Sequence, residues 1–280
     1  MKKHKELWSL FLTKEKLFLI VAIFILINLS IYIVYRKSIY SQPGYFDAFP
    51  QAGLEFYYYL HCIGLNQFIF FLMMLLVPNI ISYDFLNYHQ NHSACYIEMR
   101  IGKENYYKQA FIMNIIMTTL VICLLEILIV FTIHFFYAPL QFNAFDYPEL
   151  YYRTTQILSS HEFISLICFI ILTSLGYGLI SSVLFSMQII ISNKYIYRCF
   201  GVIFGILLVL LPAFIQVFVP IENAAFVLQI NNLVALGMEN VRENPFFLPH
   251  WLLYGVCFSI YATISYYSFI AMLKWRQRYD

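Results

Sequence analysis

YDFLNYHQNHSACYIEMRIGKENYYKQ, residues 83–109, is the polar stretch around which the rest of the chain is organised. It lies between two apolar runs, each close to the roughly 20 residues that a helix needs to cross a bilayer. Ser93 is a good helix N-cap, and Gly102 fits the residue just past a helix end. Residues 93–102 are therefore predicted to form a short helix outside the membrane.

This predicted helix has two distinct faces. Ala94, Ile97 and Ile101 recur at the i, i+3 and i+7 spacing of one helical face. Tyr96 and Arg100 share a neighbouring face, four residues apart. A chain that only had to turn back toward the membrane would use a few residues here. We therefore interpret the whole stretch as a platform for a partner protein.

The composition places the chain in a membrane. Hydrophobic residues make up 61% of it and charged residues 11%, whereas soluble globular domains carry about 25% charged residues. Apolar runs long enough to cross a bilayer recur six times. The sequence predicts a single domain over residues 1–280, an all-α polytopic membrane protein with six transmembrane helices. The predicted spans are 17–35, 65–82, 110–136, 164–191, 199–219 and 251–273.

Three segments outside these spans carry further expectations. Residues 1–16 place lysines on one side of a helix and apolar residues on the other, which predicts an amphipathic helix lying in the membrane interface. A charged flank that merely orients the first span is the alternative. The aromatic run 56–59 is interpreted as a belt at headgroup depth. Residues 220–250 are predicted to be an extracellular loop whose middle, 223–238, forms an amphipathic helix.

The basic residues are unevenly distributed between the two sides. If the spans alternate, 13 of the 17 lysines and arginines lie on the side of the N-terminus and of residues 83–109. The other four are Arg36, Lys37, Arg153 and Arg242. The positive-inside rule then places both termini and the 83–109 stretch in the cytoplasm.

The sequence lacks the common motifs of nucleotide, metal and hydrolase chemistry. G-x-x-x-x-G-K-[ST], H-E-x-x-H and G-x-S-x-G are all absent, so we expect no cofactor bound by this chain. His89 and His92 are the only close histidine pair, and they lack a third ligand at a clear spacing. The six scattered cysteines form no C-x-x-C pair, which favours packing over metal binding. A net charge of +2 does not indicate nucleic acid as a partner.

Glu126 is the one charged residue well inside a predicted span. An ionisable group there is costly, so it should face the bundle interior and have a partner. Because the six spans contain no lysine or arginine, we expect a neutral Glu126 that donates a hydrogen bond to an adjacent helix. The side chains considered as partners are Asn28, Asn114 and Gln188. A structural role and a role in proton coupling, substrate contact or gating both remain open.

Two backbone features stand out within the spans. Pro78 lacks a backbone N–H and is predicted to kink or end the second span. The motif Gly201-x-x-x-Gly205 in the fifth span permits close approach of another helix.

Together these parts resemble the ABC-2 type permease, the membrane half of a type V ABC transporter. The resemblance in topology covers an interfacial N-terminal helix, six spans, a helical inner loop and an outer insertion before the last span. At the level of residues it rests on a set in and beside the 83–109 stretch: Asp84, Tyr96-Ile97, Arg100-x-Gly102-Lys103 and Tyr106-Tyr107-x-Lys108. Asp84 stands where the family more often has glutamate.

The resemblance implies a permease that exports a peptide, a lipid or another amphipathic substrate from a bacterial cell across its plasma membrane. Its partners would be separate ABC ATPase subunits, a second copy or a homologous permease, and membrane lipid. ATP and magnesium would be bound by the ATPase subunits, so the permease would not itself be an enzyme. Helix 93–102 would be the coupling helix. The ATPase-coupling residues by this resemblance are Tyr96, Ile97, Arg100, Gly102 and Lys103.

Two other classes of function remain open at this point. A secondary transporter or channel would show inverted repeats or paired broken helices. Pro78 and the Gly176/Gly178 pair do not occupy corresponding positions in two halves. A membrane-embedded enzyme would need several polar groups at one depth, and Glu126 alone does not supply them.

Overall fold

The structure is a computed structural model that describes residues 13–45, 52–62, 67–90, 94–142, 161–191, 193–218, 226–236 and 249–279. All regular secondary structure within these ranges is helical. Most of the predicted interfacial helix 1–16 lies outside the described residues. Residues 14–16 already belong to the first long helix, because the Thr13 side chain accepts a hydrogen bond from the Lys16 N–H and caps it there.

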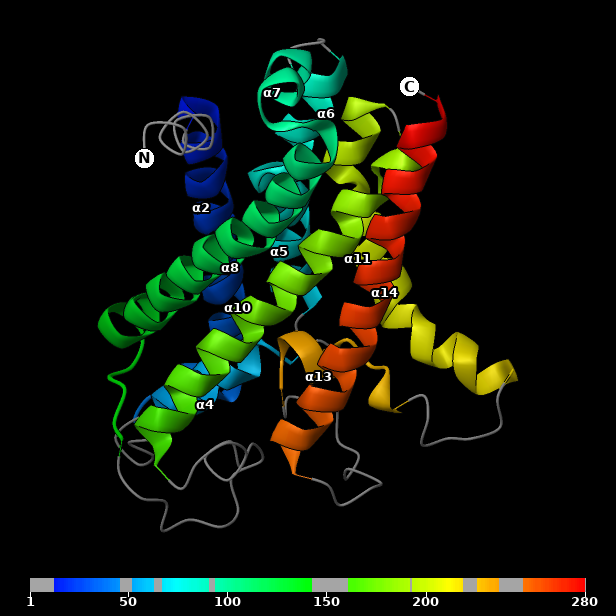
Figure 1. Ribbon diagram of the computed structural model, residues 1–280. Coiled ribbons are helices and arrows are strands. Elements are labelled where there is room, and N and C mark those ends of the chain that lie inside the picture. The colour runs from blue at the N-terminus through cyan, green and yellow to red at the C-terminus, as the bar shows by residue number, and fades with distance from the viewer. Residues whose placement is uncertain are drawn as a thin grey trace.

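Six helical segments are long and apolar enough to cross a membrane, as the sequence predicts. They are α2 (Lys14–Lys37), α5 with α6 (Gln67–Ile80 and Ser82–Gln90), α8 (Lys103–Phe136), α10 (Glu162–Ser186), α11 (Lys194–Phe218) and α14 (His250–Tyr279). This is the architecture of a multi-pass membrane protein. The helices α8 and α14 continue beyond the predicted spans at the same end of the bundle (Figure 1).

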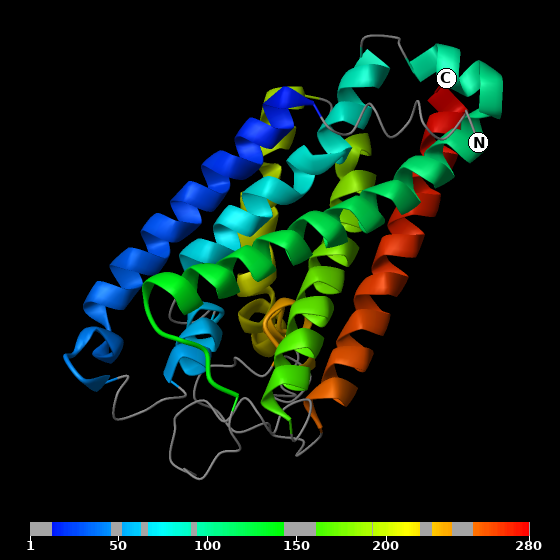
Figure 2. The ribbon, with the colours of Figure 1, turned by 90° about the vertical axis from the view of Figure 1, so that its left-hand side faces the viewer.

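The bundle has two different ends (Figure 1). The short helix α7 (Ala94–Ile101), the start of α2 and the end of α14 lie at one of them, here named the α7 end. The helix α4 (Ala52–Leu60) and the short α13 (Asn231–Val234) lie at the opposite end, the α4 end. Figure 2 shows the same division from the side. The helix α10 is central, since it packs against α5, α8, α13 and α14.

Pro78 breaks the second span as predicted. The helix α5 runs through Pro78 to Ile80, and α6 starts at Ser82 after a turn. The Asn79 side chain spans this break, because its amide donates to the carbonyl of Leu75 at 2.8 Å and to that of Arg198 at 3.0 Å. The break is therefore fixed to the second turn of α11.

The two glycines of the fifth span belong to α11 and pack closely against α5, which confirms the prediction. Pro78 has no N–H to donate, so the carbonyl of Met74, four residues earlier, lacks its usual helical partner. Gly201 approaches that carbonyl so closely that a Cβ would lie 2.0 Å from the oxygen. At Gly205 a Cβ would meet only side-chain atoms, at 3.1 Å and beyond. Any larger residue at position 201 would therefore clash with the backbone of α5, whereas at position 205 side chains could move to make room.

The aromatic run 56–59 does not form a belt at headgroup depth, contrary to the prediction. It belongs to α4, which folds back into the bundle and packs against α8. Phe56, Tyr57 and Tyr58 are at most 1% exposed. The rings of Tyr57 and Tyr58 lie edge-on to Phe169 of α10, with centroids 5.9 and 5.1 Å away. The outer loop therefore contributes to the core.

The loop between spans five and six also enters the bundle, where the sequence predicts an interfacial amphipathic helix. Residues 226–236 are largely buried, and within them Phe226, Val227 and the four residues of α13 are helical. Leu233 is fully buried against α10. Gly176 makes room for it, because a Cβ there would lie 2.2 Å from the Leu233 carbonyl oxygen. The described part of this loop closes the α4 end from the other side.

Candidate functional site

The helices α6, α7 and α8 build a cap that projects beyond the bundle at the α7 end (Figure 1). The helix predicted over 93–102 is present as α7, while Ser93 lies outside the described residues. Tyr96 is 76% exposed and Met99 84% exposed, and Arg100 is also exposed. Two large apolar side chains and a cation are therefore presented to the surroundings from one helix of eight residues.

Gly102 sets the angle between α7 and α8. Its φ is +83° and its ψ is 139°, so the positive φ expected of a helix end is present. The ψ value places it in an extended region open to glycine, and not in the left-handed helical region that is usual for a glycine just past a helix end. Its N–H donates to the Glu98 carbonyl at 2.8 Å, and its own carbonyl accepts from the Tyr106 N–H at 3.0 Å. One residue thus ends α7 and starts α8.

The other residues predicted to contact a partner are placed less clearly. The backbone of Ile97 lies in α7, but its side chain is outside the described part of the structure. Lys103 is the first residue of α8 and is half-buried. Of the histidine pair, the side chain of His89 and the whole of His92 lie outside the described residues.

An aromatic cluster supports the cap from below. The Phe85 ring centroid lies 5.1 Å from that of Tyr106 and 4.7 Å from that of Phe185, so α6, α8 and α10 meet there. The cluster also includes residues of α14. Its buried members are Phe85, Tyr106, Tyr107, Ala110, Phe185, Phe269 and Met272.

A chain of buried hydrogen bonds lies one layer deeper. The Ser82 hydroxyl donates to Asn114 Oδ1 at 2.9 Å, and Asn114 Nδ2 donates to the Ser181 carbonyl at 2.9 Å. Gln188 Nε2 donates to the Ser82 carbonyl at 2.7 Å. The Tyr197 hydroxyl donates to a carbonyl of α10. Because buried polar groups are costly to leave unpaired, these bonds fix α6 to α8 and to the turn after α10, α8 to α10, and α11 to α10.

Charged residues join the same region to its neighbours. Asp84 forms an ion pair with Lys16 of α2, and both side chains are largely buried, with 19% and 10% exposed. The guanidinium of Arg198 in α11 lies 3.9 Å from the centroid of the Tyr83 ring. Removing one partner of such a buried pair would leave an uncompensated charge. The start of α6 is therefore held from three sides.

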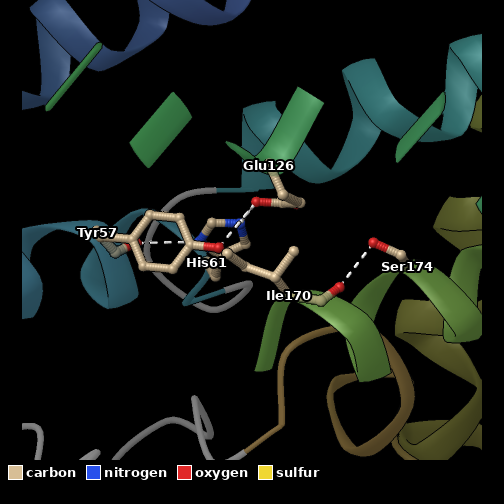
Figure 3. Close-up of polar contacts among 5 residues, drawn as sticks. All are labelled: Tyr57, His61, Glu126, Ile170 and Ser174. Atoms are coloured by element: carbon tan, nitrogen blue, oxygen red, sulfur yellow. Dashed lines mark hydrogen bonds and ion pairs between the residues drawn. The ribbon is translucent and has the colours of Figure 1, made fainter. Parts of the chain in front are cut away.

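Glu126 is fully buried, as predicted, but its partners differ from those expected (Figure 3). The Tyr57 hydroxyl donates to Glu126 Oε2 at 3.0 Å, and His61 Nε2 lies 2.9 Å from the same oxygen. The expectation of no basic partner is wrong, because α4 carries a histidine into the bundle from outside the six spans. The three side chains considered from the sequence bond elsewhere: Asn28, Asn114 and Gln188.

The surroundings of this site are apolar and nearly closed. His61 packs edge-on to the Phe169 ring, with centroids 5.4 Å apart. A cavity of about 10 Å³ adjoins the site, which is the size of a single water. Glu126 is one of its lining residues. Glu126 Oε1 has no hydrogen-bond partner among the described residues. Burial lowers the pKa of His61, but the charge and the hydrogen bond of Glu126 outweigh it, so the pKa lies above its ordinary value.

Sequence reasoning missed Tyr57 and His61, although a signal was present. Tyr57 lies in the aromatic run 56–59, and His61 follows it by four residues, about one helical turn. Glu55 directly precedes the run. A belt at headgroup depth does not require polar groups at helical spacing. That spacing favours a helix with a polar stripe, and the fold turns the stripe toward Glu126.

The described residues contain no group of three or more histidine, cysteine, aspartate or glutamate side chains placed to hold a metal ion. Comparison with protein-family models, with curated proteins and with solved structures finds no match. The resemblance to ABC-2 permeases therefore rests on the topology and on the residues quoted above.

Proposed function

We propose that this chain is the membrane permease subunit of an ATP-driven exporter of the ABC-2 type. The observation that carries the proposal is the projecting helix α7. It exposes Tyr96 and Met99 at the end of the bundle and is joined through Gly102 directly to the 34-residue α8. Large exposed apolar side chains clustered on one element are typical of a protein contact.

The chain needs such a contact if it works against a gradient with the energy of ATP. Its sequence has no phosphate-binding motif, so the free energy has to arrive as movement of a docked element. The helix α7 suits this task because α8 continues from it without an internal glycine or proline. The buried bonds of Asn114 then link α8 to α6 and α10. A displacement of the cap would therefore reach the central helix.

Sidedness and partners follow from the same proposal. The excess of basic residues at the α7 end supports a cytoplasmic location for that end and for both termini. The partners are two ABC ATPase subunits, a second permease of the same or a homologous kind, and lipid. The cargo is a peptide, a lipid or another amphipathic molecule leaving the cell.

Co-purification tests the proposal. A reading frame next to this one is expected to encode an ATPase with a Walker A motif, and that ATPase should co-purify with the full-length chain. Tyr96→Ala combined with Met99→Ala should weaken the complex at least about fivefold, the effect of losing more than 1 kcal/mol at an interface.

Phe136→Ala is the matched control for this test, because Phe136 is an equally exposed aromatic side chain at the opposite end of α8. It should leave the complex intact. Equal recovery of the ATPase with the α7 double variant and with the wild type would remove α7 from the mechanism.

A second candidate is favoured by one observation, the buried Glu126–His61 pair. Ionisable pairs inside a bundle are typical of proton relays in secondary transporters. Transport by the full-length chain alone in proteoliposomes, driven by a pH difference and without any ATPase, would support this candidate against the exporter.

A further inference from the structure

The hydrogen bonds around His61 determine how many protons the Glu126–His61 pair holds. His61 Nδ1 lies 3.0 Å from the backbone carbonyl oxygen of Tyr57. A carbonyl oxygen only accepts, so Nδ1 carries a hydrogen. Nε2 faces Glu126 Oε2 at 2.9 Å, and a hydrogen bond there requires one further proton between them. This proton sits either on the imidazole, as an ion pair, or on the carboxyl group, as a neutral pair.

The same two groups in water hold one proton fewer at neutral pH. A free glutamate with a pKa of about 4.3 is ionised, and a free histidine with a pKa of about 6.5 is mostly neutral. Without the shared proton, a lone pair of Nε2 would face the carboxylate oxygen inside an apolar site. The contact between α4 and α8 therefore depends on taking up this proton.

We propose that the Glu126–His61 pair is a proton-binding site that holds α4 in its buried position, and that loss of this proton releases α4 from α8. In the closed position α4 and residues 226–236 cover the cavity at the α4 end, leaving space for about one water. Release of α4 would open that cavity toward its side of the membrane. The inference does not require an ATPase partner, because it concerns only contacts within this chain.

Two other carboxyl groups of the described residues lie on α4 or against it, but neither acts on His61. Burial raises the pKa of Glu55 in α4 to about 7. Glu162 of α10 interacts with Tyr58, whereas Glu126 and the Tyr57 carbonyl are the groups that act on His61. The other ionisable side chains close to the pair are phenols and a thiol, which come from α4, α8 and α10. They are Tyr57, Tyr58, Cys123 and Tyr177. The helix α5 and residues 226–236 present only apolar side chains to the cavity: Ile69, Phe70, Met73, Val234 and Ala235. Glu55 of α4 faces Tyr40 and Tyr45 instead.

The sign of the pH dependence follows from the proton count. The closed position holds one proton more than the released one, so alkaline pH favours release. Above the ordinary histidine pKa of about 6.5, the ratio of closed to released α4 should fall about tenfold per pH unit. The fall ends at the raised pKa of His61, above which the contact is lost.

Cys62 reports the position of α4, since it follows His61 and is only 1% exposed. The test uses the full-length chain in lipid nanodiscs with its other five cysteines replaced by alanine, and measures maleimide labelling of Cys62 from pH 6 to 9. The replaced residues are Cys95, Cys123, Cys168, Cys199 and Cys257. Glu126→Gln is the reference, because its amide donates to His61 Nε2 and keeps the contact without a titrating proton.

Dividing the wild-type labelling rate by that of Glu126→Gln cancels the pH dependence of the thiol itself. We expect this ratio to rise with pH above 7, by up to about tenfold per unit. Tyr57→Phe removes a donor without changing the proton count, so it should raise labelling at every pH with the same slope. A ratio that stays constant from pH 6 to 9 overturns the inference.

Discussion

Replacing Gly102 by alanine tests whether the α7–α8 angle is set by this one residue. The backbone there has φ +83° and ψ 139°, which side chains with a Cβ rarely adopt. Space is not the obstacle, because the nearest atom to an added Cβ is Asn105 Nδ2 at 3.9 Å. The cost of Gly102→Ala is therefore conformational.

The destabilisation caused by Gly102→Ala can be estimated from the backbone conformation alone. A residue held in a sparsely populated backbone region costs about 1–3 kcal/mol. The cost is relieved by opening the bonds on either side of Gly102, its N–H to Glu98 and its carbonyl to Tyr106. At 1.36 kcal/mol per tenfold change, the opened population should rise about 5- to 150-fold.

Hydrogen exchange, measured by mass spectrometry on the full-length chain, reports the fraction of molecules in which the hydrogen bonds at the α7–α8 junction are open. Two alanine variants serve as controls. Gly44→Ala places the same strain, at φ +78° with no atom within 4 Å, in a turn at the α4 end. Gly255→Ala lies in α14 with open space around it and should gain up to about 1 kcal/mol of helix propensity.

Faster exchange at the junction is expected for Gly102→Ala alone. With an ATPase partner present, the same variant should lower stimulated ATP turnover while the complex still forms. Unchanged exchange at the junction would show that α7 keeps its angle without glycine. Equal loosening of the junction in Gly44→Ala would show a global effect, and either result refutes the local argument.

Three further outcomes are expected. Gly201→Ala places a Cβ 2.0 Å from a backbone oxygen and should cost about 1–3 kcal/mol, lowering Tm by several degrees in detergent, whereas Gly205→Ala, facing side chains at 3.1 Å, should change it little. Asn114→Leu leaves the groups it bonds on α6 and α10 unpaired and should cost a further 1–3 kcal/mol or so by the same measurement. Burial raises the pKa of Glu55 to about 7, so the folded carboxyl keeps a proton that the unfolded one loses from about pH 4.5 upward. Stability should therefore fall between about pH 4.5 and 7, and a Glu55→Gln variant with the same fall would contradict this assignment.

Much of the fold could be predicted because the signals are local. An apolar run of about 20 residues has few alternatives to a spanning helix, so the six spans follow from hydropathy alone. The helix α7 follows from its periodicity and from Gly102, and the break after Pro78 follows from a missing donor. Each of these features depends on residues that are neighbours in the sequence.

The buried loops could not be predicted in this way. Whether the aromatic run 56–59 faces lipid headgroups or a protein core depends on what else fills the core. Leu233 is buried only because Gly176 on another helix leaves room for it. The pairing of His61 with Glu126 joins residues 65 positions apart, so the sequence near Glu126 holds no trace of its partner.

The helix α8 connects the features at both ends of the bundle. Gly102 stands before its first turn, Asn114 bonds α6 and α10 three turns later, and Glu126 holds α4 toward the far end, about 36 Å from Gly102 along the axis. No glycine or proline interrupts this length, and we propose that α8 moves as one body. A tilt imposed at α7 therefore changes the 2.9 Å contact on which the shared proton depends. By linkage, protonation of that contact must bias the angle of α7 to the same extent.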